Sequence, residues 1–366
     1  MVCQPQRMLV FKGKTNPFPV FLFPFLLYNE AIMDHKDEIK DAPDGNFDAT
    51  LRPSRWDEYI GQETTKTNLR LIIDAAKARG EAPDHMLFYG QPGLGKTTLA
   101  YLIAKELNTQ IKSTSGPALE KAGDVAALLT NLEPHDILFI DEAHRVNIAI
   151  EEILYPAMES RKIHLIIGKG PSARAFSLDL PPFTIIAATT RANLLSAPLR
   201  SRFGATFRLD YYTVPDIKKI ITRSAHILNI SIEDHAAEKL AQAARFTPRT
   251  ANRLLKRARD YAQMYNNNSI NTDAVYKTLE LLEIDEFGLD KTDRELLSTI
   301  IEKFAGGRVG LKSLGAAINE EPGTIEDVYE PYLIKIGLLH RTPSGRIATK
   351  SAYRHLGHQE KSSELF

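Results

Sequence analysis

A glycine-rich stretch, GQPGLGKT (residues 90–97), has the composition and spacing of a phosphate-binding loop. It fits the pattern G-x-x-x-x-G-K-[ST], follows an apolar run and precedes a helical pattern, which is the context that such a loop needs. Its glycines let backbone N–H groups surround phosphate oxygens, and the dipole of the next helix favours an anion there. We expect Lys96 to reach the β- and γ-phosphates of ATP, Thr97 to ligate Mg²⁺, and Thr98 to add a phosphate contact.

An acidic pair follows a second apolar run, LFIDEAHR (138–145). Ligands of open α/β sheets bind beyond the carboxyl ends of the strands, where this pair would lie. We expect Asp141 to hold the Mg²⁺ shell and Glu142 to polarise the attacking water. The Asp-Glu-Ala-His string does not indicate a DEAH-box helicase, because the surrounding motifs differ. His144 is not needed for this chemistry, and a structural role is expected for it.

Two further segments supply hydroxyl and guanidinium groups beyond a third apolar run. AATTR (187–191) places Thr189 or Thr190 beside the acidic pair, and a hydroxyl there would orient the water or sense the γ-phosphate. We assign this role to Thr189 first. SAPLRSRFG (196–204) carries Arg200 and Arg202, and one of them would act as an arginine finger. A finger at a subunit edge suits a ring, because heterologous contacts that close a rotation build rings.

The start of a later helix carries an unusual cation. In FTPRTANR (246–253), Thr247 is the expected N-cap, Pro248 suits the first helical position and Arg249 lies in the first turn. The helix dipole disfavours a cation there. We therefore expect Arg249 to serve an anion, and the bound phosphates are the nearest candidate.

These groups need three consecutive domains to position them. The strand-like runs 86–90, 136–141 and 183–190 are almost continuously apolar and alternate with helical patterns, which predicts an α/β domain with a parallel sheet over residues 49–210. Residues 211–285 show helical patterns without a strand-like run. Residues 286–357 read as helix, short helix, longer helix and a two-stranded ribbon, which is the order of a winged helix. Residues 358–366 would be a tail.

The segment before these domains, residues 1–48, is predicted to be an extension or flexible tail. Its apolar run FPVFLFPFLLY (18–28) is interrupted by Pro19 and Pro24 and is shorter than the roughly 20 residues that span a bilayer. No A-x-A cleavage site follows it. We expect Met33 to be the natural start and expect no membrane association.

The bulk composition limits the class of protein. The chain has 366 residues, with 46 Lys and Arg against 46 Asp and Glu, so any polyanion-binding surface must be local. Its one cysteine, Cys3, excludes a disulfide framework and fits a reducing, cytoplasmic location.

One such local surface is predicted in the third domain. Residues 331–358 contain no Asp or Glu but five Lys or Arg residues, whereas residues 320–330 are acidic. A basic ribbon facing phosphates gives salt-dependent, sequence-independent affinity for DNA.

Together these motifs resemble the AAA+ ATPases and, more specifically, the RuvB family, the bacterial motors of Holliday-junction branch migration. The resemblance runs from about Leu51 to Leu356. The stretches that carry it, besides the phosphate loop, are TSGPALEKAGDVAALLTNLEPHDILFIDEAHR, LYPAME, DLPPFTIIAATTRANLLSAPLRSRFG and TPRTANRLLKRARD.

The resemblance implies a role for individual residues. Those implied to bind ATP are Leu51 and Arg52 at the adenine, Gly93, Lys96, Thr97 and Thr98 at the phosphates, Glu159, Ser160 and Arg161, the trans finger Arg202, and Tyr212 and Arg249 from the helical lid. Arg341 and Arg346 are implied to contact DNA. Ser344 replaces a common wing arginine, which is expected to weaken DNA affinity slightly.

A hairpin is expected within RKIHLIIGKGPSARAFSLDLPPF (161–183), over about residues 161–182. Gly168 to Pro171 would form its turn. Phe176 and Leu178 share one face and would be either core residues or an exposed anchor for a partner. The resemblance favours the anchor, because the RuvB family docks the junction-binding protein RuvA through a hairpin here.

The function implied is an ATP-driven hexameric DNA translocase. With RuvA, it would drive branch migration on the duplex arms of Holliday junctions in recombination and repair, and the RuvC resolvase is a further candidate partner. The alternative is an AAA+ switch of the clamp-loader type, which would share the ATPase core without the basic wing. A protein unfoldase would need aromatic pore loops, and a transcription factor would need base-reading residues; neither is evident.

Overall fold

The computed structural model describes residues 49–167, 174–266 and 268–359. The expectations for the N-terminal segment before Ala49, for the turn at Gly168 to Pro171 and for most of the C-terminal tail lie outside these residues. Among the described residues, no helix has the length and apolar character to cross a membrane.

The first domain is built on a parallel sheet of five strands, in the order β2-β3-β6-β1-β7. The strands are β1 (Met86–Tyr89), β2 (Ile111–Ser115), β3 (Ile137–Asp141), β6 (Thr184–Thr189) and β7 (Ala205–Arg208). The three strands expected from apolar runs are central, and the two missed by that criterion are the edges. β2 reads IKSTS and is only partly buried, so its composition carries no apolar run.

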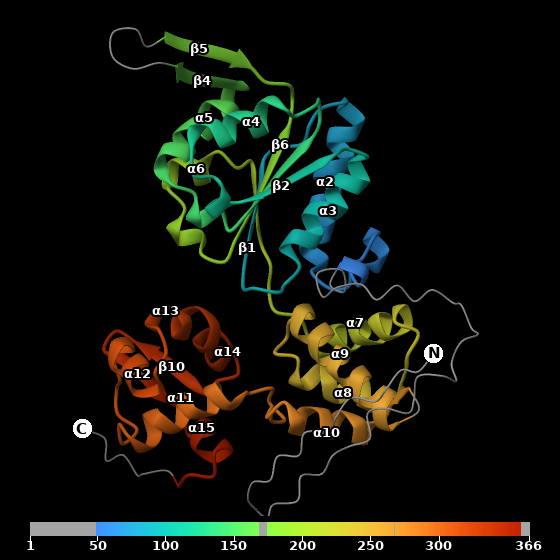
Figure 1. The fold of residues 1–366 in the computed structure, drawn as a ribbon, viewed down its shortest axis with the longest axis vertical. Coiled ribbons are helices and arrows are strands. Elements are labelled where there is room, and N and C mark those ends of the chain that lie inside the picture. The colour runs from blue at the N-terminus through green and yellow to red at the C-terminus, as the bar shows by residue number, and fades with distance from the viewer. Residues whose placement is uncertain (1–48, 168–173, 267, 360–366) are drawn as a thin grey trace, which may run out of the picture. The chain divides into compact units, whose positions relative to one another are not determined.

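Helices cover both faces of this sheet (Figure 1), and alternate strand residues feed two separate cores. On one face, α2 (Glu63–Arg79) and α3 (Lys96–Leu107) pack on Phe88, Phe139 and Ile186. On the other, α4 (Ala122–Thr130), α5 (Ile148–Ser160) and α6 (Ala197–Ser201) pack on Leu87 and Leu138. Burial on both faces explains the continuous apolar runs of the central strands.

The strand register brings the motifs together. Tyr89 of β1 lies opposite Thr189 of β6, and Ile140 of β3 lies opposite Ala187. The phosphate loop after β1, the acidic pair at the end of β3 and the threonines at the end of β6 therefore share one edge of the sheet.

The expected hairpin is present in its described part. β4 (Lys162–Ile167) pairs antiparallel with β5 (Arg174–Asp179), with Ile163 opposite Leu178. Phe176 and Leu178 are 45% and 43% exposed, so neither is a core residue. The exposed interpretation of the hairpin is the one that the geometry fits.

The helical domain contains α7 (Val214–Ile227), α8 (Asp234–Ala243), α9 (Pro248–Tyr265) and α10 (Thr272–Leu281). Three of its four helix starts are fixed by side-chain caps, because Thr213, Thr247 and Asn271 each accept from a backbone N–H group in the first turn. The expectation of no strand here was wrong in one detail. Ser231–Ile232 (β8) and Ser269–Ile270 (β9) form a parallel pair that is too short to leave a pattern.

The third domain is a winged helix around α11 (Lys291–Glu302) and α12 (Leu311–Ile318). The expected longer helix is present as one continuous helical run, made of α13 (Pro322–Thr324), a π-helical turn (Ile325–Tyr329) and α14 (Glu330–Lys335). The ribbon is β10 (Leu339–Thr342) with β11 (Gly345–Ala348), and Val309 bridges to Arg346 beside it. A final helix, α15 (Lys350–His355), was not predicted.

Candidate nucleotide site

The phosphate loop joins β1 to α3 through glycines in conformations that other residues rarely adopt. Gly93 has φ 78° and Gly95 has φ 95°. A Cβ on Gly93 would lie 2.9 Å from the Cβ of Arg249, and one on Gly95 would lie 2.9 Å from the Tyr59 hydroxyl. The loop therefore packs tightly against both the N-terminal segment of the domain and the start of α9, and only glycine fits.

Lys96 begins α3 with its ammonium directed back into the loop. Its Nζ donates to the carbonyl oxygens of Gly90 at 2.8 Å and Gln91 at 2.9 Å. Burial lowers the pKa of Lys96 to about 8, although the Asp141 carboxylate acts in the opposite direction. The charge is thus held in a poorly hydrated position where an anionic ligand would favour it.

The expected Mg²⁺ ligands face each other. The Thr97 hydroxyl donates to Asp141 Oδ2 at 3.3 Å, which links the start of α3 to the end of β3. A hydroxyl and a carboxylate oxygen are ligands that Mg²⁺ prefers. No group of three or more His, Cys, Asp or Glu that could hold a metal occurs among the described residues. The pair therefore fits Mg²⁺ that takes its remaining ligands from phosphate and water.

Glu142, the expected base, follows Asp141 in the left-handed region, with φ 48°. Its backbone N–H donates to Asp141 Oδ1 at 2.9 Å, and its carboxylate lies 3.1 Å from the guanidinium of Arg145. The sharp bend turns the chain off the strand so that both carboxylates line the same cavity.

The two threonines at the end of β6 separate into different roles. Thr189, our first choice as sensor, is buried; its Oγ1 lies 2.9 Å from Nδ1 of His144 and accepts from the backbone N–H of Arg191 at 3.0 Å. Thr190 is exposed and lines the cavity. The geometry therefore favours Thr190 over Thr189 as the hydroxyl that faces ligand, because alternate strand residues point to opposite sides. The expected structural role of His144 fits its contact with Thr189.

The cavity has a volume of about 370 Å³ and receives side chains from the first domain and from the lid. The expected residues that line it are Leu51, Arg52, Gly93, Lys96, Thr97, Thr98, Asp141, Glu142, Tyr212 and Arg249. At one end, the Tyr212 hydroxyl donates to the Tyr59 hydroxyl at 3.1 Å, and burial raises the pKa of Tyr212 to about 12. The phosphate loop, Asp141 and Glu142 line the same cavity.

Two polar residues of the lid line the cavity without having been anticipated. Arg223 of α7 donates to the Leu51 carbonyl at 2.9 Å and to Glu58 at 3.0 Å, and thereby fastens the lid to the segment at the adenine end. Asn252 of α9 lies one turn from Arg249 and accepts from Ser224 at 2.9 Å. Both lie within ordinary amphipathic helices, and no local pattern distinguishes them.

The other four expected ATP contacts do not line this cavity. Arg202 pairs with Glu159 at 3.0 Å, lies 4.3 Å from the centroid of the Tyr155 ring and donates to the Pro198 carbonyl at 2.7 Å. Ser160 and Arg161 follow directly at the end of α5, with Arg161 in the left-handed region at φ 54°. The structure thus gathers Arg202 with residues 159–161 in a second group.

The two arginines expected on DNA differ in exposure. The Arg341 side chain is 53% exposed and pairs with Glu326 at 2.6 Å. Arg346 is only 8% exposed, and its guanidinium is held by the buried Glu330 at 2.5 and 3.2 Å. The predicted DNA contact of Arg346 stays a prediction, and its guanidinium is engaged in an ion pair inside the domain, whereas that of Arg341 is largely exposed.

Family models match nearly all of the described chain. Residues 51–209 match the Holliday junction DNA helicase RuvB P-loop domain, residues 212–285 the RuvB AAA lid domain and residues 286–357 the RuvB C-terminal winged helix domain.

Solved structures give the same likeness. The Thermotoga maritima RuvB Holliday junction branch migration motor is 52% identical, with a TM-score of 0.78 over 85% of this chain and 100% of that chain. An alanine-to-serine variant of the same Thermotoga protein is also 52% identical, with a TM-score of 0.79 over 85% of this chain and 99% of that one.

Proposed function

The chain belongs to the RuvB family of Holliday-junction branch-migration motors and is an ATP hydrolase, and we propose that it works as a hexameric ring that moves duplex DNA. Its substrates would be ATP and the duplex arms of Holliday junctions, in the cytoplasm where both are present. A junction-binding protein of the RuvA type would be its partner.

One observation supports the proposed ring. Lys96, Asp141 and Arg249 line one cavity, whereas Arg202 and residues 159–161 form a group that does not line it. Phosphoryl transfer commonly needs an arginine beyond the lysine of the phosphate loop. Arg249 lines the cavity from the lid of its own chain, and Arg202, which does not line it, is the candidate for a second arginine donated by a neighbouring copy. Such a donation, repeated around a closed rotation, would build a ring.

Within the site, the residues divide the work by position. Lys96 and the loop N–H groups would bind the phosphates, and Thr97 with Asp141 would hold Mg²⁺, which neutralises phosphate charge when bound. Glu142 would polarise the attacking water, and Thr190 would orient it. Tyr212, Leu51 and Arg52 would hold the adenine, and Arg249 would report the phosphates to the lid.

The DNA and partner surfaces lie on other elements. Arg341 on the ribbon would contact the DNA backbone, with Arg346 stabilising the ribbon. Phe176 and Leu178 on the hairpin would anchor the RuvA-type partner, because exposed apolar side chains on a protruding element are typical of such anchors.

The test is a branch-migration assay. Purified protein is mixed with a RuvA-type protein, ATP and a synthetic junction with homologous arms, and strand products are followed over time. We expect product with the natural chain, none with Lys96→Ala, and none from a junction with heterologous arms. ATP hydrolysis stimulated by DNA without strand products would contradict the translocase and favour a clamp-loader-type switch.

A further inference from the structure

A bend between α8 and α9 holds two consecutive residues in an unusual backbone conformation. Arg245 has φ 52° and Phe246 has φ 56°, both in the left-handed region that residues other than glycine seldom adopt. Such conformations persist where surrounding contacts impose them, and they concentrate at functional sites.

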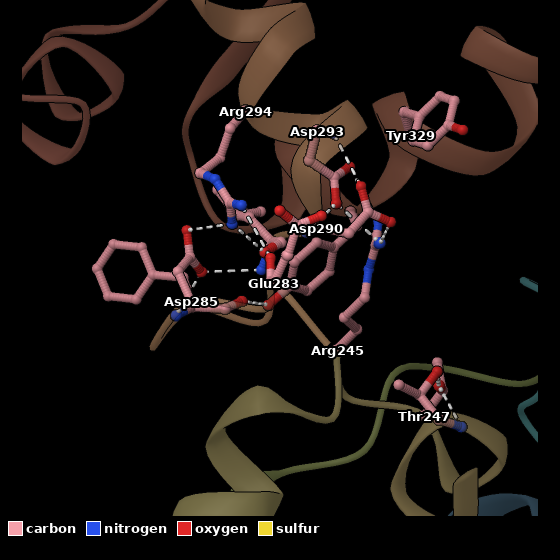
Figure 2. Close-up of polar contacts among 12 residues, drawn as sticks. Arg245, Thr247, Glu283, Asp285, Asp290, Asp293, Arg294 and Tyr329 are labelled. Carbon is pink, nitrogen blue, oxygen red and sulfur yellow. Dashed lines mark hydrogen bonds and ion pairs between the residues drawn. The ribbon is translucent and has the colours of Figure 1, made fainter. Parts of the chain in front are cut away.

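On one side, Arg245 reaches the winged helix (Figure 2). Its Nη1 lies 2.9 Å and its Nη2 3.4 Å from the carboxylate of Asp293, which is fully buried, and Asp290 lies 3.8 Å away. Asp290 and Asp293 form the capping box that starts α11. Arg245 is thus bound to the first turn of the first helix of the DNA-binding domain.

The aromatic contacts extend the same attachment. The guanidinium carbon of Arg245 lies 4.5 Å from the centroid of the Tyr332 ring in α14. The Phe246 ring is 6.0 Å from the Tyr332 ring and 6.3 Å from the Tyr211 ring. The Phe246 carbonyl accepts from the backbone N–H of Tyr212 at 3.1 Å. The bend therefore contacts both the winged helix and the entry to the lid, where Tyr212 lines the nucleotide cavity.

On the other side, the bend runs directly into the nucleotide site. Thr247 caps α9, and Arg249 follows in the first turn, where it lines the cavity. The phosphate loop packs on this start so closely that a Cβ on Gly93 would clash with Arg249. Only three residues separate Arg245 from Arg249, and one of them, Thr247, is held by its cap bond from the Thr250 N–H.

We propose that Arg245 is a positioning residue that ties the winged helix to the nucleotide-sensing start of α9. Movement of Arg249 with nucleotide state would reach α11 through the bend and the Arg245–Asp293 pair. This inference rests on the proposed function, since it assigns the link by which ATP hydrolysis moves the DNA-binding domain. Arg245 contacts neither nucleotide nor DNA in this role.

The test separates hydrolysis from movement. The Arg245→Met, Asp293→Asn double variant removes the ion pair without leaving a buried charge, and Arg245→Lys keeps a cation. We expect the double variant to retain basal ATP hydrolysis and duplex binding within about twofold, and to complete about tenfold less branch migration per ATP hydrolysed. Arg245→Lys should recover part of this ratio, because the charge remains near Asp293.

Arg294→Met is the matched control. Arg294 donates to the carbonyl oxygens of Leu289 at 2.7 Å and Glu283 at 2.8 Å, and so braces the same joint without touching the bend (Figure 2). We expect it to keep the natural ratio of migration to hydrolysis.

Two results would overturn the inference. One is a double variant that migrates as far per ATP as the natural chain. The other is a double variant whose thermal midpoint, basal hydrolysis and DNA binding fall together with migration, which would show a purely structural role. If the natural chain itself gave no migration, the proposed function would fail instead.

Discussion

At the scale of the residue, the clearest division of labour is between Thr189 and Thr190. The Thr189 hydroxyl is occupied by His144 and the backbone N–H of Arg191, whereas Thr190 lines the nucleotide cavity. We expect Thr190→Val to lower kcat for ATP hydrolysis about a hundredfold, because loss of one positioned polar group in an active site commonly has an effect of this size. Nucleotide affinity should change little. Steady-state hydrolysis and a fluorescent-nucleotide titration measure the two quantities.

Thr189→Val is the matched control for this assignment. It should lower kcat less than Thr190→Val, because it disturbs the His144 contact and not the groups around the phosphates. A larger loss of kcat in Thr189→Val would return the sensor role to Thr189.

His85 gives a second residue-scale prediction. Its Nδ1 accepts from the Ile185 N–H at 2.8 Å, and its Nε2 lies 3.2 Å from the Met158 carbonyl, a pattern that needs a neutral ring protonated at Nε2. Burial lowers the pKa of His85 below its ordinary value of 6.5. The unfolded chain therefore takes up a proton below about pH 6.5 that the folded chain does not. The stability from His85 is complete above that pH and is lost as the pH falls toward the folded pKa.

We expect His85→Asn to flatten this dependence. Urea unfolding at pH 7.5 and at pH 5.5 should show a larger loss of unfolding free energy in the natural chain than in the variant. Equal losses would mean that His85 titrates normally in the folded chain.

At the scale of the element, the β4–β5 hairpin presents Phe176 and Leu178 to solvent. We expect Phe176→Ser to weaken binding of a RuvA-type partner about tenfold or more, since a buried aromatic anchor commonly carries over 1 kcal/mol of an interface. Basal ATP hydrolysis should not change. Leu71→Ser is a suitable control, because Leu71 of α2 is 71% exposed and lies on another element. Calorimetric titration with the partner would measure both, and equal affinities would remove the hairpin from the interface.

The ribbon of the winged helix makes opposite predictions for its two arginines. Arg341→Ala should weaken duplex binding and lower the slope of log K against log salt by about one, as for loss of one phosphate contact. Arg346→Ala should instead destabilise the domain by about 3 kcal/mol, because the buried Glu330 would keep only its longer, 3.9 Å contact with Arg341. DNA titrations over a salt series and thermal unfolding distinguish them. A stable Arg346→Ala variant with the reduced salt slope would restore Arg346 as a DNA contact.

The elements also show which features the sequence could predict. Central strands were predictable because burial on both faces makes them continuously apolar, and the phosphate loop was predictable because its chemistry is local. The edge strand β2 and the π-helical turn at Ile325–Tyr329 leave no such pattern. His85, Arg223 and Glu330 act through partners that are distant in the chain, so their roles depend on the fold.

At the scale of the whole molecule, the function was easier to predict from the sequence than the geometry of the site, as the three family matches illustrate. The motifs that identify the motor are contiguous stretches of sequence. The role of the group around Arg202, in contrast, depends on its position in the folded chain. Within one chain, Arg202 pairs with Glu159 and lies on Tyr155, and it does not line the cavity that holds Lys96. The site is therefore expected to be completed by a second copy.

This arrangement predicts how mixed subunits behave. Arg202→Ala alone and Lys96→Ala alone should each reduce ATP hydrolysis by about a hundredfold or more, because every site in a uniform ring lacks one essential group. When the two variants are mixed, some sites pair the intact loop of an Arg202→Ala subunit with the intact arginine of a Lys96→Ala neighbour. Hydrolysis should then rise well above the sum of the two variants and peak near an equal mixture. An Arg200→Ala chain, mixed with Lys96→Ala in the same way, controls for the neighbouring arginine. If mixtures hydrolyse ATP no faster than the separate variants while native mass spectrometry shows mixed rings, Arg202 acts within its own chain and the shared site is excluded.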